Sequence, residues 1–319
     1  MKVLVTGATG YLGRAILSAL ESAGHRPVAF ARSASRAGLA GDVVDGDVRD
    51  VQALERAAAG CDAICHSAAL VAVWRRRPRE FDEVNVGGLV NVLLAARHAG
   101  IRRIVYTSSF LALAPGGADA SHPWNDYQRT KAAADRVAAA AVKQGAPLVR
   151  VYPGVIYGPG PLTDGNLVGR MISDHLAGRL PGVLGADSRW SYSFVHDVAA
   201  GHVAAIERGR LGARYQLGGE NARQMAVFEI VRHLTGVALP RRIPASAGVV
   251  VGLIEEARAM LTGRAPLLTV GTVEILQRDW MLDSGQAERE LGYHVTPLGE
   301  GVRAVVAGCA PEKESERRE

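Results

Sequence analysis

Apolar positions follow two rhythms along the first half of the 319-residue chain. Short β-branched runs show no polar alternation, and each is followed by a longer segment rich in alanine and leucine. Such runs are typical of strands buried on both faces, and the longer segments are typical of the helices that cover them. The predicted strands are 2–6, 26–31, 41–47, 62–67, 102–109 and 147–152, and the predicted helices are 11–23, 51–59, 80–98 and 125–143.

Regular alternation of strands and helices predicts an α/β fold with a doubly wound parallel sheet, which we assign to residues 1–160. Beyond this point helical patterns dominate, and we interpret residues 161–310 as mainly a smaller, mostly helical C-terminal lobe. Segments of about 190–218 are expected to return to the first domain, and the charged tail 311–319 is expected to be disordered. The helices predicted here are 164–178, 224–236, 245–262, 269–278 and 284–291, and the strands are 191–195 and 213–218.

Composition and charge indicate an ordinary globular protein. Hydrophobic residues make up 48% of the chain and charged residues 22%, and the net charge of +5 comes from scattered arginines. The densest basic run, "WRRRPR" at 74–79, is interpreted as a solvated helix start. Aromatic residues make up only 5%, so we expect no nucleic-acid partner.

The cysteines and the apolar runs indicate in which cellular compartment the protein is expected. Cys61, Cys65 and Cys309 form neither a disulfide framework nor a paired metal-binding signature, so we predict no metal site and a reducing compartment. The N-terminus breaks into glycine too early for a signal peptide. The apolar run 247–254 is too short to span a bilayer and meets Glu255. We therefore expect a cytoplasmic protein without a membrane partner.

A glycine-rich turn follows the first predicted strand. The sequence "TGATGYLGRAIL" places Gly7, Gly10 and Gly13 between that strand and an amphipathic helix. Glycines let the backbone turn tightly and approach a pyrophosphate closely, and the helix N-terminus offers free N–H groups. Because the strand and helix supply the required context, the motif predicts a dinucleotide-binding, Rossmann-type domain.

The end of the second strand should meet the adenosine ribose. "FARSASR" offers Arg32 and Arg36 there, with no carboxylate before Asp42. Because arginine can grip a 2′-phosphate, NADP(H) is favoured over NAD(H), unless Arg32 simply faces solvent. Asp47, at the end of the third strand, either accepts from the adenine amino group or caps the next helix.

The fourth and fifth strands end in small and hydroxylic residues. "HSAALV" leaves room for a nicotinamide, and "YTSS" places Ser108 and Ser109 at the sheet edge where ligands of open α/β sheets bind. In "YQRTK", Tyr127 and Lys131 lie one helical turn apart. Alone, this pair would be read as a solvated helix face, but beside Ser109 it becomes a candidate acid–base pair.

The order TGATGYLG, HSAA, TSS, YQRTK and PGVIYGPG resembles the extended and atypical short-chain dehydrogenase/reductase superfamily. Within it, the chain is similar to the NAD-dependent epimerase/dehydratase group and to dihydroflavonol-4-reductase-like proteins, over residues 1 to about 305. The resemblance implies that Tyr127 is the general acid–base, that Lys131 lowers its pKa and binds the nicotinamide ribose, and that Ser109 holds the substrate oxygen. Ser108 is the less favoured alternative for that last role.

The resemblance and the strand-end positions together imply a cofactor site. Asn85 matches an asparagine beneath the cofactor, although it is equally well a polar residue capping or crossing a helix. Tyr152 departs from the family pattern, which usually has arginine there. The full set of implied cofactor residues is Gly7, Thr9, Gly10, Tyr11, Leu12, Gly13, Arg32, Arg36, Asp47, Val48, Ser67, Ala68, Ala69, Asn85, Thr107, Lys131, Pro153, Gly154 and Val155.

Residues after Ser109 narrow the reaction. Dehydratase relatives carry an Asp-Glu pair beside this position, whereas this chain has Phe110 and Leu111. We therefore expect an NADP(H)-dependent oxidoreductase acting on a carbonyl or alcohol of a small, fairly apolar molecule, with an NAD-dependent sugar-nucleotide epimerase as the alternative. Relatives often dimerise through the helices at about 80–98 and 125–143, and others are monomers. Candidate pocket residues, each of which is equally well part of the core, are Phe110, Leu111, Trp124, Tyr157, Met171, Trp190 and Tyr192.

Overall fold

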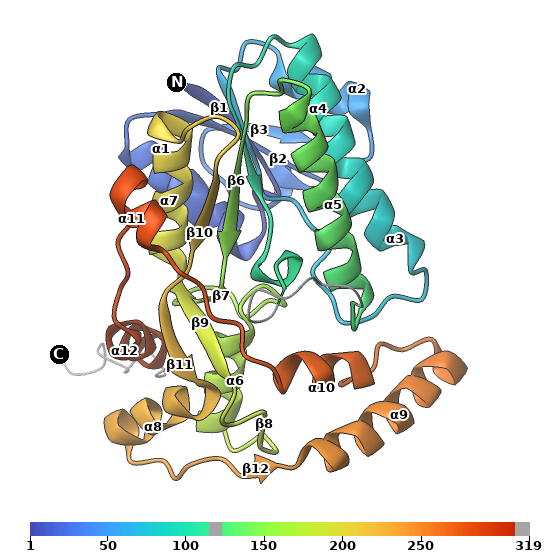
Figure 1. Cartoon of the computed structure of the whole chain (residues 1–319), viewed down its shortest axis with the longest axis vertical. Coiled ribbons are helices and arrows are strands. Elements are labelled where there is room, and N and C mark those ends of the chain that lie inside the picture. Colours follow the sequence, from blue (N-terminus) through green and yellow to red (C-terminus); the bar gives the residue numbers. More distant parts are fainter. Residues whose placement is uncertain (115–122, 310–319) are drawn as a thin grey trace, which may run out of the picture.

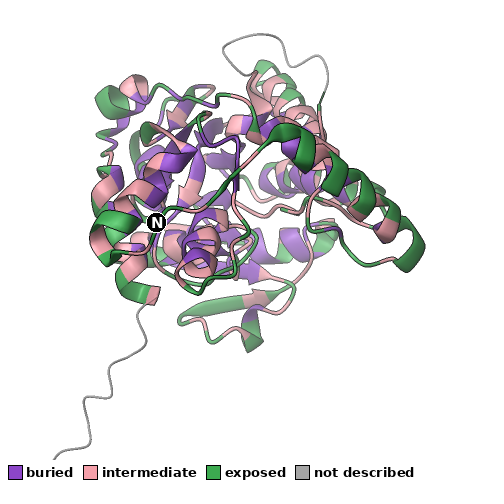
Figure 2. Cartoon of the chain, turned by 90° about the horizontal axis from the view of Figure 1, so that it is seen from below, coloured by how far each residue is buried: buried purple, intermediate pink, exposed green. Residues whose placement is uncertain are grey.

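The computed structural model describes residues 1–114 and 123–309. The tail at 311–319 lies outside these residues, so its disorder stays a prediction. Buried residues concentrate in the sheet and in the helix faces against it, whereas one helical arm is mostly exposed (Figure 2).

Seven parallel strands form the central sheet, in the spatial order β10-β6-β5-β4-β1-β2-β3 (Figure 1). The order turns back between β1 and β4, so their carboxyl ends form the switch point where ligands of such sheets bind. The predicted doubly wound parallel sheet is confirmed. The strands are β1 (Lys2–Thr6), β2 (Arg26–Ala31), β3 (Asp42–Asp45), β4 (Ala63–His66), β5 (Ile104–Thr107), β6 (Leu148–Pro153) and β10 (Arg214–Leu217).

Two layers of helices cover the sheet (Figure 1). On one face α1 packs against α7, and α7 against α11, around a core that includes Ile16 and Leu20. On the other face α2 packs against α4, and α4 against α5, around Leu54 and Val92. The helices are α1 (Tyr11–Ser22), α2 (Val51–Ala58), α3 (Arg79–Phe81), α4 (Gly88–His98), α5 (Asp126–Lys143), α7 (Val195–Arg208) and α11 (Gly285–Leu291).

A second group of elements lies below the carboxyl edge of the sheet (Figure 1). Its own core includes Ile172, Trp190 and Phe228. Strands β11, β9 and β7 form one small sheet, and β12 pairs with β8. These elements are β7 (Val155–Tyr157), β8 (Val183–Leu184), β9 (Arg189–Phe194), β11 (Glu220–Arg223), β12 (Arg242–Ile243), α6 (Leu167–Leu176), α8 (Gln224–Thr235), α9 (Ala245–Thr262), α10 (Val270–Leu276) and α12 (Leu298–Cys309).

Several elements differ from the sequence prediction. The single helix expected at 80–98 is α3 and α4, joined by a π-helical turn at Asp82–Gly87. Helix α7 was not predicted, because it is buried on nearly every side and shows no single apolar stripe. Helix α12 was missed because glycine at three positions weakens its helical signal. Among the described residues, no helix combines the length and apolarity needed to cross a membrane.

Candidate active site

The turn after β1 depends on two glycines. Gly7 has a φ of +74°, a conformation that favours glycine, and a Cβ there would lie 2.7 Å from the Ala68 backbone. A Cβ on Gly13 would lie 2.1 Å from the Gly7 carbonyl oxygen. Both positions therefore require glycine for the close packing of α1, β1 and the end of β4.

Helix α1 begins with donors that have no partner in the described part of the chain. Gly10 is its N-cap residue and offers no side-chain acceptor. The N–H groups of Tyr11, Leu12 and Gly13 accordingly remain available at the positive end of the helix dipole. This cradle fits the pyrophosphate of a dinucleotide.

The ends of β2 and β3 form the predicted adenosine end of the site. Arg32 follows β2 directly and is exposed, while Arg36 donates to the Ser33 hydroxyl at 3.2 Å. Asp47 is held by the Arg49 guanidinium at 3.0 and 2.7 Å, which lowers the pKa of its carboxyl. The alternative that Asp47 caps the next helix is wrong.

The cap of α2 is Asp50, which accepts from the Ala53 N–H at 3.0 Å. Val48, another predicted cofactor residue, is buried, and a Cβ on Gly88 would meet its side chain at 2.9 Å. Its carbonyl accepts from Asn91 at 2.9 Å. In this structure Val48 therefore fixes α4 to the end of β3.

Three hydroxyl and amine groups meet where β5 ends. Ser109 is buried and caps a short 3₁₀ turn by accepting from the Leu111 N–H at 3.2 Å. Tyr127 is the second residue of α5, and Lys131 lies one turn further along the same face. The Lys131 ammonium is buried and donates to the Thr107 carbonyl at 2.8 Å. The structure thus brings the predicted catalytic trio to one sheet edge.

Burial sets the protonation of this trio. It raises the pKa of Tyr127 to about 12, although a hydrogen bond with Ser109 opposes the rise. It lowers the pKa of Lys131 to about 8, with Asp135 acting in the opposite direction. At neutral pH the phenol is therefore protonated and the ammonium still charged. That Lys131 lowers the pKa of Tyr127 stays a prediction for the enzyme with oxidised nicotinamide bound.

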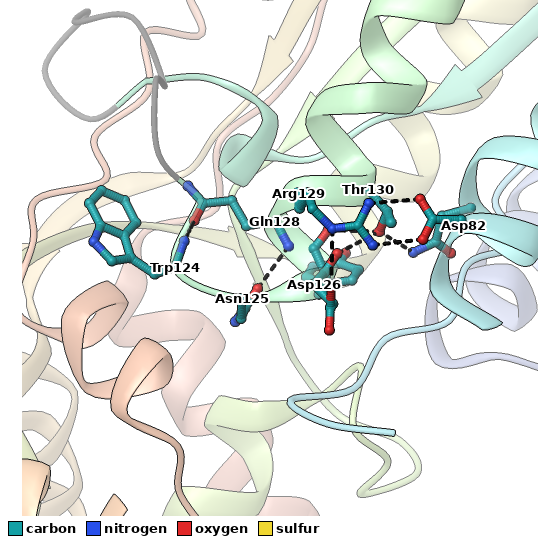
Figure 3. Close-up of polar contacts among 9 residues, drawn as sticks. Asp82, Trp124, Asn125, Asp126, Gln128, Arg129 and Thr130 are labelled. Carbon is teal, nitrogen blue, oxygen red and sulfur yellow. Dashed lines mark hydrogen bonds and ion pairs between the residues drawn. The ribbon is translucent and has the colours of Figure 1, made fainter. Parts of the chain in front are cut away.

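The N-terminal end of α5 is tied down on three sides (Figure 3). Asn125 caps the helix by accepting from the Gln128 N–H at 2.8 Å, and the Gln128 side chain accepts from the Trp124 N–H at 2.9 Å. The Arg129 guanidinium grips both carboxylate oxygens of Asp82 at 2.7 Å. Tyr127 lies between these anchors, so its backbone is fixed relative to Ser109.

The comparisons with known proteins agree with this geometry. A match to the profile of the NAD dependent epimerase/dehydratase family covers residues 3–218. The chain belongs to this family. It is 33% identical to sterol demethylase protein B of Methylococcus capsulatus, over 92% of this chain and 93% of that protein. It is 30% identical to a putative dihydroflavonol 4-reductase of Synechocystis, over 90% and 88% of the two chains.

Solved structures extend the likeness to the fold. The crystal structure of gox2253 superposes with a TM-score of 0.80 and 30% identity, covering 96% of this chain and 97% of that one. A nucleoside-diphosphate-sugar epimerase from Pseudomonas aeruginosa superposes with a TM-score of 0.75 and 25% identity, covering 97% of each chain. The protein is therefore a nicotinamide-dependent oxidoreductase of the extended short-chain dehydrogenase/reductase type.

Hydrogen bonds within the protein hold the carboxyl ends of β4 and β5. The Ser67 hydroxyl donates to the Thr6 carbonyl at 2.8 Å, and Ala68 packs over Gly7. The Thr107 hydroxyl donates to His202 Nε2 at 2.9 Å, because His202 Nδ1 already gives its hydrogen to the Val198 carbonyl. Thr107 therefore positions Lys131 through its carbonyl, while its hydroxyl fixes the strand to α7.

The segment after β6 is equally tight. Gly154 donates its N–H to the Ser193 hydroxyl at 3.0 Å, and a Cβ there would lie 2.4 Å from the Ser191 carbonyl oxygen. Pro153 and Val155 on either side are buried. The predicted nicotinamide-facing segment is thus rigid, whereas Ala69 and Thr9 are only partly buried at the mouth of the glycine turn.

Asn85 links three elements around the catalytic helix. It lies in the π-helical turn, accepts from the Leu70 N–H at 2.7 Å and donates to the Leu70 carbonyl at 3.3 Å. Its amide also donates to the Thr130 hydroxyl at 3.0 Å, one residue before Lys131. The side chain is 3% exposed, so this geometry supports the helix-crossing alternative left open by the sequence.

Replacing Asn85 by alanine is expected to lower the free energy of unfolding by about 2–3 kcal/mol, because three hydrogen bonds are lost, a buried one to Thr130 and two half-buried ones to Leu70. Urea denaturation measures this loss. Asn91→Ala, which removes the single bond to Val48, is the matched control and should cost about 1 kcal/mol or less. A stable Asn85→Ala variant with weakened NADPH binding would instead assign Asn85 to the cofactor.

A polar network behind the trio was not predicted. Asp135, on α5, accepts from the Tyr152 hydroxyl at 2.5 Å and from the Ser108 hydroxyl at 3.3 Å. Arg150 lies 3.8 Å from the same carboxylate, and Arg214 donates to Tyr152 at 3.2 Å. Ser108 is thereby committed to the network, and Ser109 is the hydroxyl beside Tyr127. Tyr152, which stands where the family usually has arginine, is thus hydrogen-bonded to Asp135 on α5.

An aromatic cluster forms the apolar side of the site. Phe110 packs against Trp190 and Trp280 with ring centroids 5.9 and 5.5 Å apart, and Trp124 packs edge-on against Trp280 at 6.2 Å. Sequence reasoning missed Trp280, because it follows α10 and reaches Trp190 only through an isolated bridge. Tyr157 lies in the core instead, against Tyr192 and Phe194.

Proposed function

We propose that the protein is an NADP(H)-dependent reductase or dehydrogenase acting on a carbonyl or secondary alcohol of a small, fairly apolar substrate. The observation that carries this proposal is that Ser109, Tyr127 and Lys131 lie together at the end of β5, next to the aromatic cluster. Phe110 and Leu111, which follow Ser109, bring no second acid or base to that side. Elimination chemistry is therefore disfavoured relative to simple exchange of a hydride and a proton.

The chain's own groups divide the work. Ser109 and Tyr127 would donate hydrogen bonds to the carbonyl oxygen, and this polarises the carbon. Tyr127 would transfer its proton to that oxygen as it gains charge, or take the proton back in the direction of oxidation. Lys131 would stabilise the phenolate that remains until a proton returns from solvent. When bound, the nicotinamide supplies or accepts the hydride.

The preference for NADP(H) rests on the adenosine end. Arg32 is the first residue after β2, and both carboxylates near the end of β3 are already engaged. Asp45 accepts from the Ser35 hydroxyl at 2.6 Å, and Asp47 pairs with Arg49 at 2.7 Å. An exposed arginine without a competing free carboxylate favours a 2′-phosphate over a ribose hydroxyl.

The test is NADPH consumption at 340 nm with a panel of ketones and aldehydes of increasing apolarity, repeated with NADH. Arg32→Ala should raise KM for NADPH by about tenfold or more and leave KM for NADH unchanged, because one charge-assisted bond is lost. Arg26→Ala, at the opposite end of β2, is the matched control and should change neither. Tightly held NAD with interconversion of nucleotide sugars would favour the epimerase alternative.

A further inference from the structure

Helix α9 buries small residues and exposes large apolar ones, the reverse of an ordinary amphipathic helix. The residues that it buries against the rest of the lobe are small, namely Gly248, Gly252 and Ala259. A Cβ on Gly252 would lie 2.9 Å from the Val270 N–H nitrogen, so the helix backbone packs directly on the start of α10. The large apolar side chains of α9 are therefore not the ones that hold it in place.

Polar groups of α9 complete this inward face. Glu256 accepts from the Val270 N–H at 2.9 Å, and Glu255 accepts from the Leu267 N–H at 2.9 Å while pairing with Arg258 at 2.7 Å. These bonds fix the rotation of α9 about its axis. Both acids of α9 therefore have partners within the lobe, and neither carboxylate is left unpaired beside the outward face.

The outward face is a broad apolar surface. At 100° per residue, the large apolar side chains of α9 lie on one side of the helix. Helix α9 itself projects from the lower group of elements (Figures 1 and 2). These side chains are 48% to 89% exposed. A single exposed leucine is normal on a protein surface, but a contiguous apolar patch of this kind marks an interaction site. With Leu267 in the following loop, the apolar surface consists of Val250, Val251, Leu253, Ile254, Met260, Leu261 and Leu267.

Arg76, from the arginine run at 74–79, lies beside the C-terminal end of this surface. Gly263 ends α9, and the Arg76 guanidinium comes within 3.2 Å of the place where a Cβ on Gly263 would stand. Val71 and Val73 of the same loop are exposed at 37% and 40%. Arg76 and Arg264, the residue after Gly263, are exposed here and form no ion pair with any described residue. The same is true of Arg77 and Arg79, which belong to the same run as Arg76.

We propose that the apolar surface of α9 and the adjacent arginines dock the protein on the surface of a bilayer that contains anionic lipid. A helix lying in the interface buries its apolar face at the acyl boundary, and arginines beside it meet the phosphates. This departs from the expectation of no membrane partner, which rested on the length of the 247–254 run and its neighbouring glutamates. Glu256 is turned toward the start of α10, and the charge of Glu255, which lies at the edge of the surface, is balanced by its ion pair with Arg258 at 2.7 Å.

A second copy of the chain fits this surface less well. Two α9 faces placed together would bring unpaired arginines from both copies to one contact, with no unpaired carboxylate on α9 to receive them. Anionic headgroups supply the missing charge next to an apolar layer. Charge complementarity therefore favours a lipid surface over self-association.

The experiment is co-sedimentation of the purified full chain with phosphatidylcholine vesicles, with and without 30% phosphatidylserine. We expect at least about tenfold tighter binding to the anionic vesicles, weakened when ionic strength rises from about 0.1 to 0.5 M. Ile254→Asp with Leu261→Asp should abolish binding, and Arg76→Glu with Arg77→Glu should remove its lipid charge dependence. Leu211→Asp, at a leucine 49% exposed between α7 and β10, is the matched control and should bind like the wild type.

Three outcomes would overturn the proposal. The wild type could remain in the supernatant with anionic vesicles, or the Ile254→Asp, Leu261→Asp variant could bind as well as the wild type. Sedimentation velocity without lipid could also show a dimer that this variant dissociates, which would make the surface a self-interface. Unchanged thermal unfolding of the variants separates each of these results from misfolding.

Discussion

Tyr127→Phe is expected to lower the turnover number for carbonyl reduction about a hundredfold to ten-thousandfold, while KM for NADPH stays within about twofold. Phenylalanine keeps the ring that packs beside the aromatic cluster but removes the phenolic proton that the proposed mechanism transfers to the substrate oxygen. Ser109 alone would still polarise the carbonyl, so a residual rate should survive. Steady-state kinetics on the best substrate of the panel measures the loss.

The matched control is Tyr215→Phe, on the edge strand β10. The Tyr215 hydroxyl donates to Glu290 at 2.6 Å, so this variant also loses a tyrosine hydrogen bond, but far along the chain from the trio. It should keep the wild-type turnover number. If Tyr127→Phe kept more than about a tenth of the wild-type rate, the proton would come from another group and the mechanism proposed here would be wrong.

The central sheet was predictable because its signal is local. Each β-branched run such as Lys2–Thr6 predicts a buried strand, and the glycine turn after it predicts both the crossover and the ligand edge. Helix α7 escaped this reasoning because burial on many sides erases the stripe that marks an amphipathic helix. The strands of the lower lobe are only two to six residues long, and pairing partners decide whether such segments form.

The candidate site divides in the same way. Ser109, Tyr127 and Lys131 could be selected as candidates because their order and spacing are visible in the sequence, and their catalytic roles stay a prediction. The Asp135 network and Trp280 were not, because each acts through residues brought close only by the fold. Asn85 is an intermediate case: the sequence marked it as a candidate position, but it did not reveal the hydrogen bond to Thr130 on α5. Motifs thus predict which groups react, and packing determines what holds them.

Gly13→Ala should reduce NADPH affinity at least about tenfold and destabilise the fold by about 1–3 kcal/mol. The added Cβ would stand 2.1 Å from the Gly7 carbonyl oxygen and 3.0 Å from Ala8 Cα, and both are backbone atoms that cannot swing aside. Helix α1 must therefore move away from the turn after β1. That movement displaces the N–H groups that form the proposed pyrophosphate cradle.

Gly299→Ala separates this steric effect from the general effect of removing a glycine. Gly299 is in α12, and a Cβ there meets nothing within 4 Å, so the substitution should be neutral or stabilise by up to about 1 kcal/mol. Fluorescence titration with NADPH and thermal unfolding of both variants measure the two effects. Wild-type affinity in Gly13→Ala would mean that α1 can shift without cost to the cofactor, and the cradle would then have to be sought elsewhere along the sheet edge. Loss of affinity with only modest destabilisation would instead place the cofactor phosphates on this helix N-terminus, since the core of α1 against α7 would be intact.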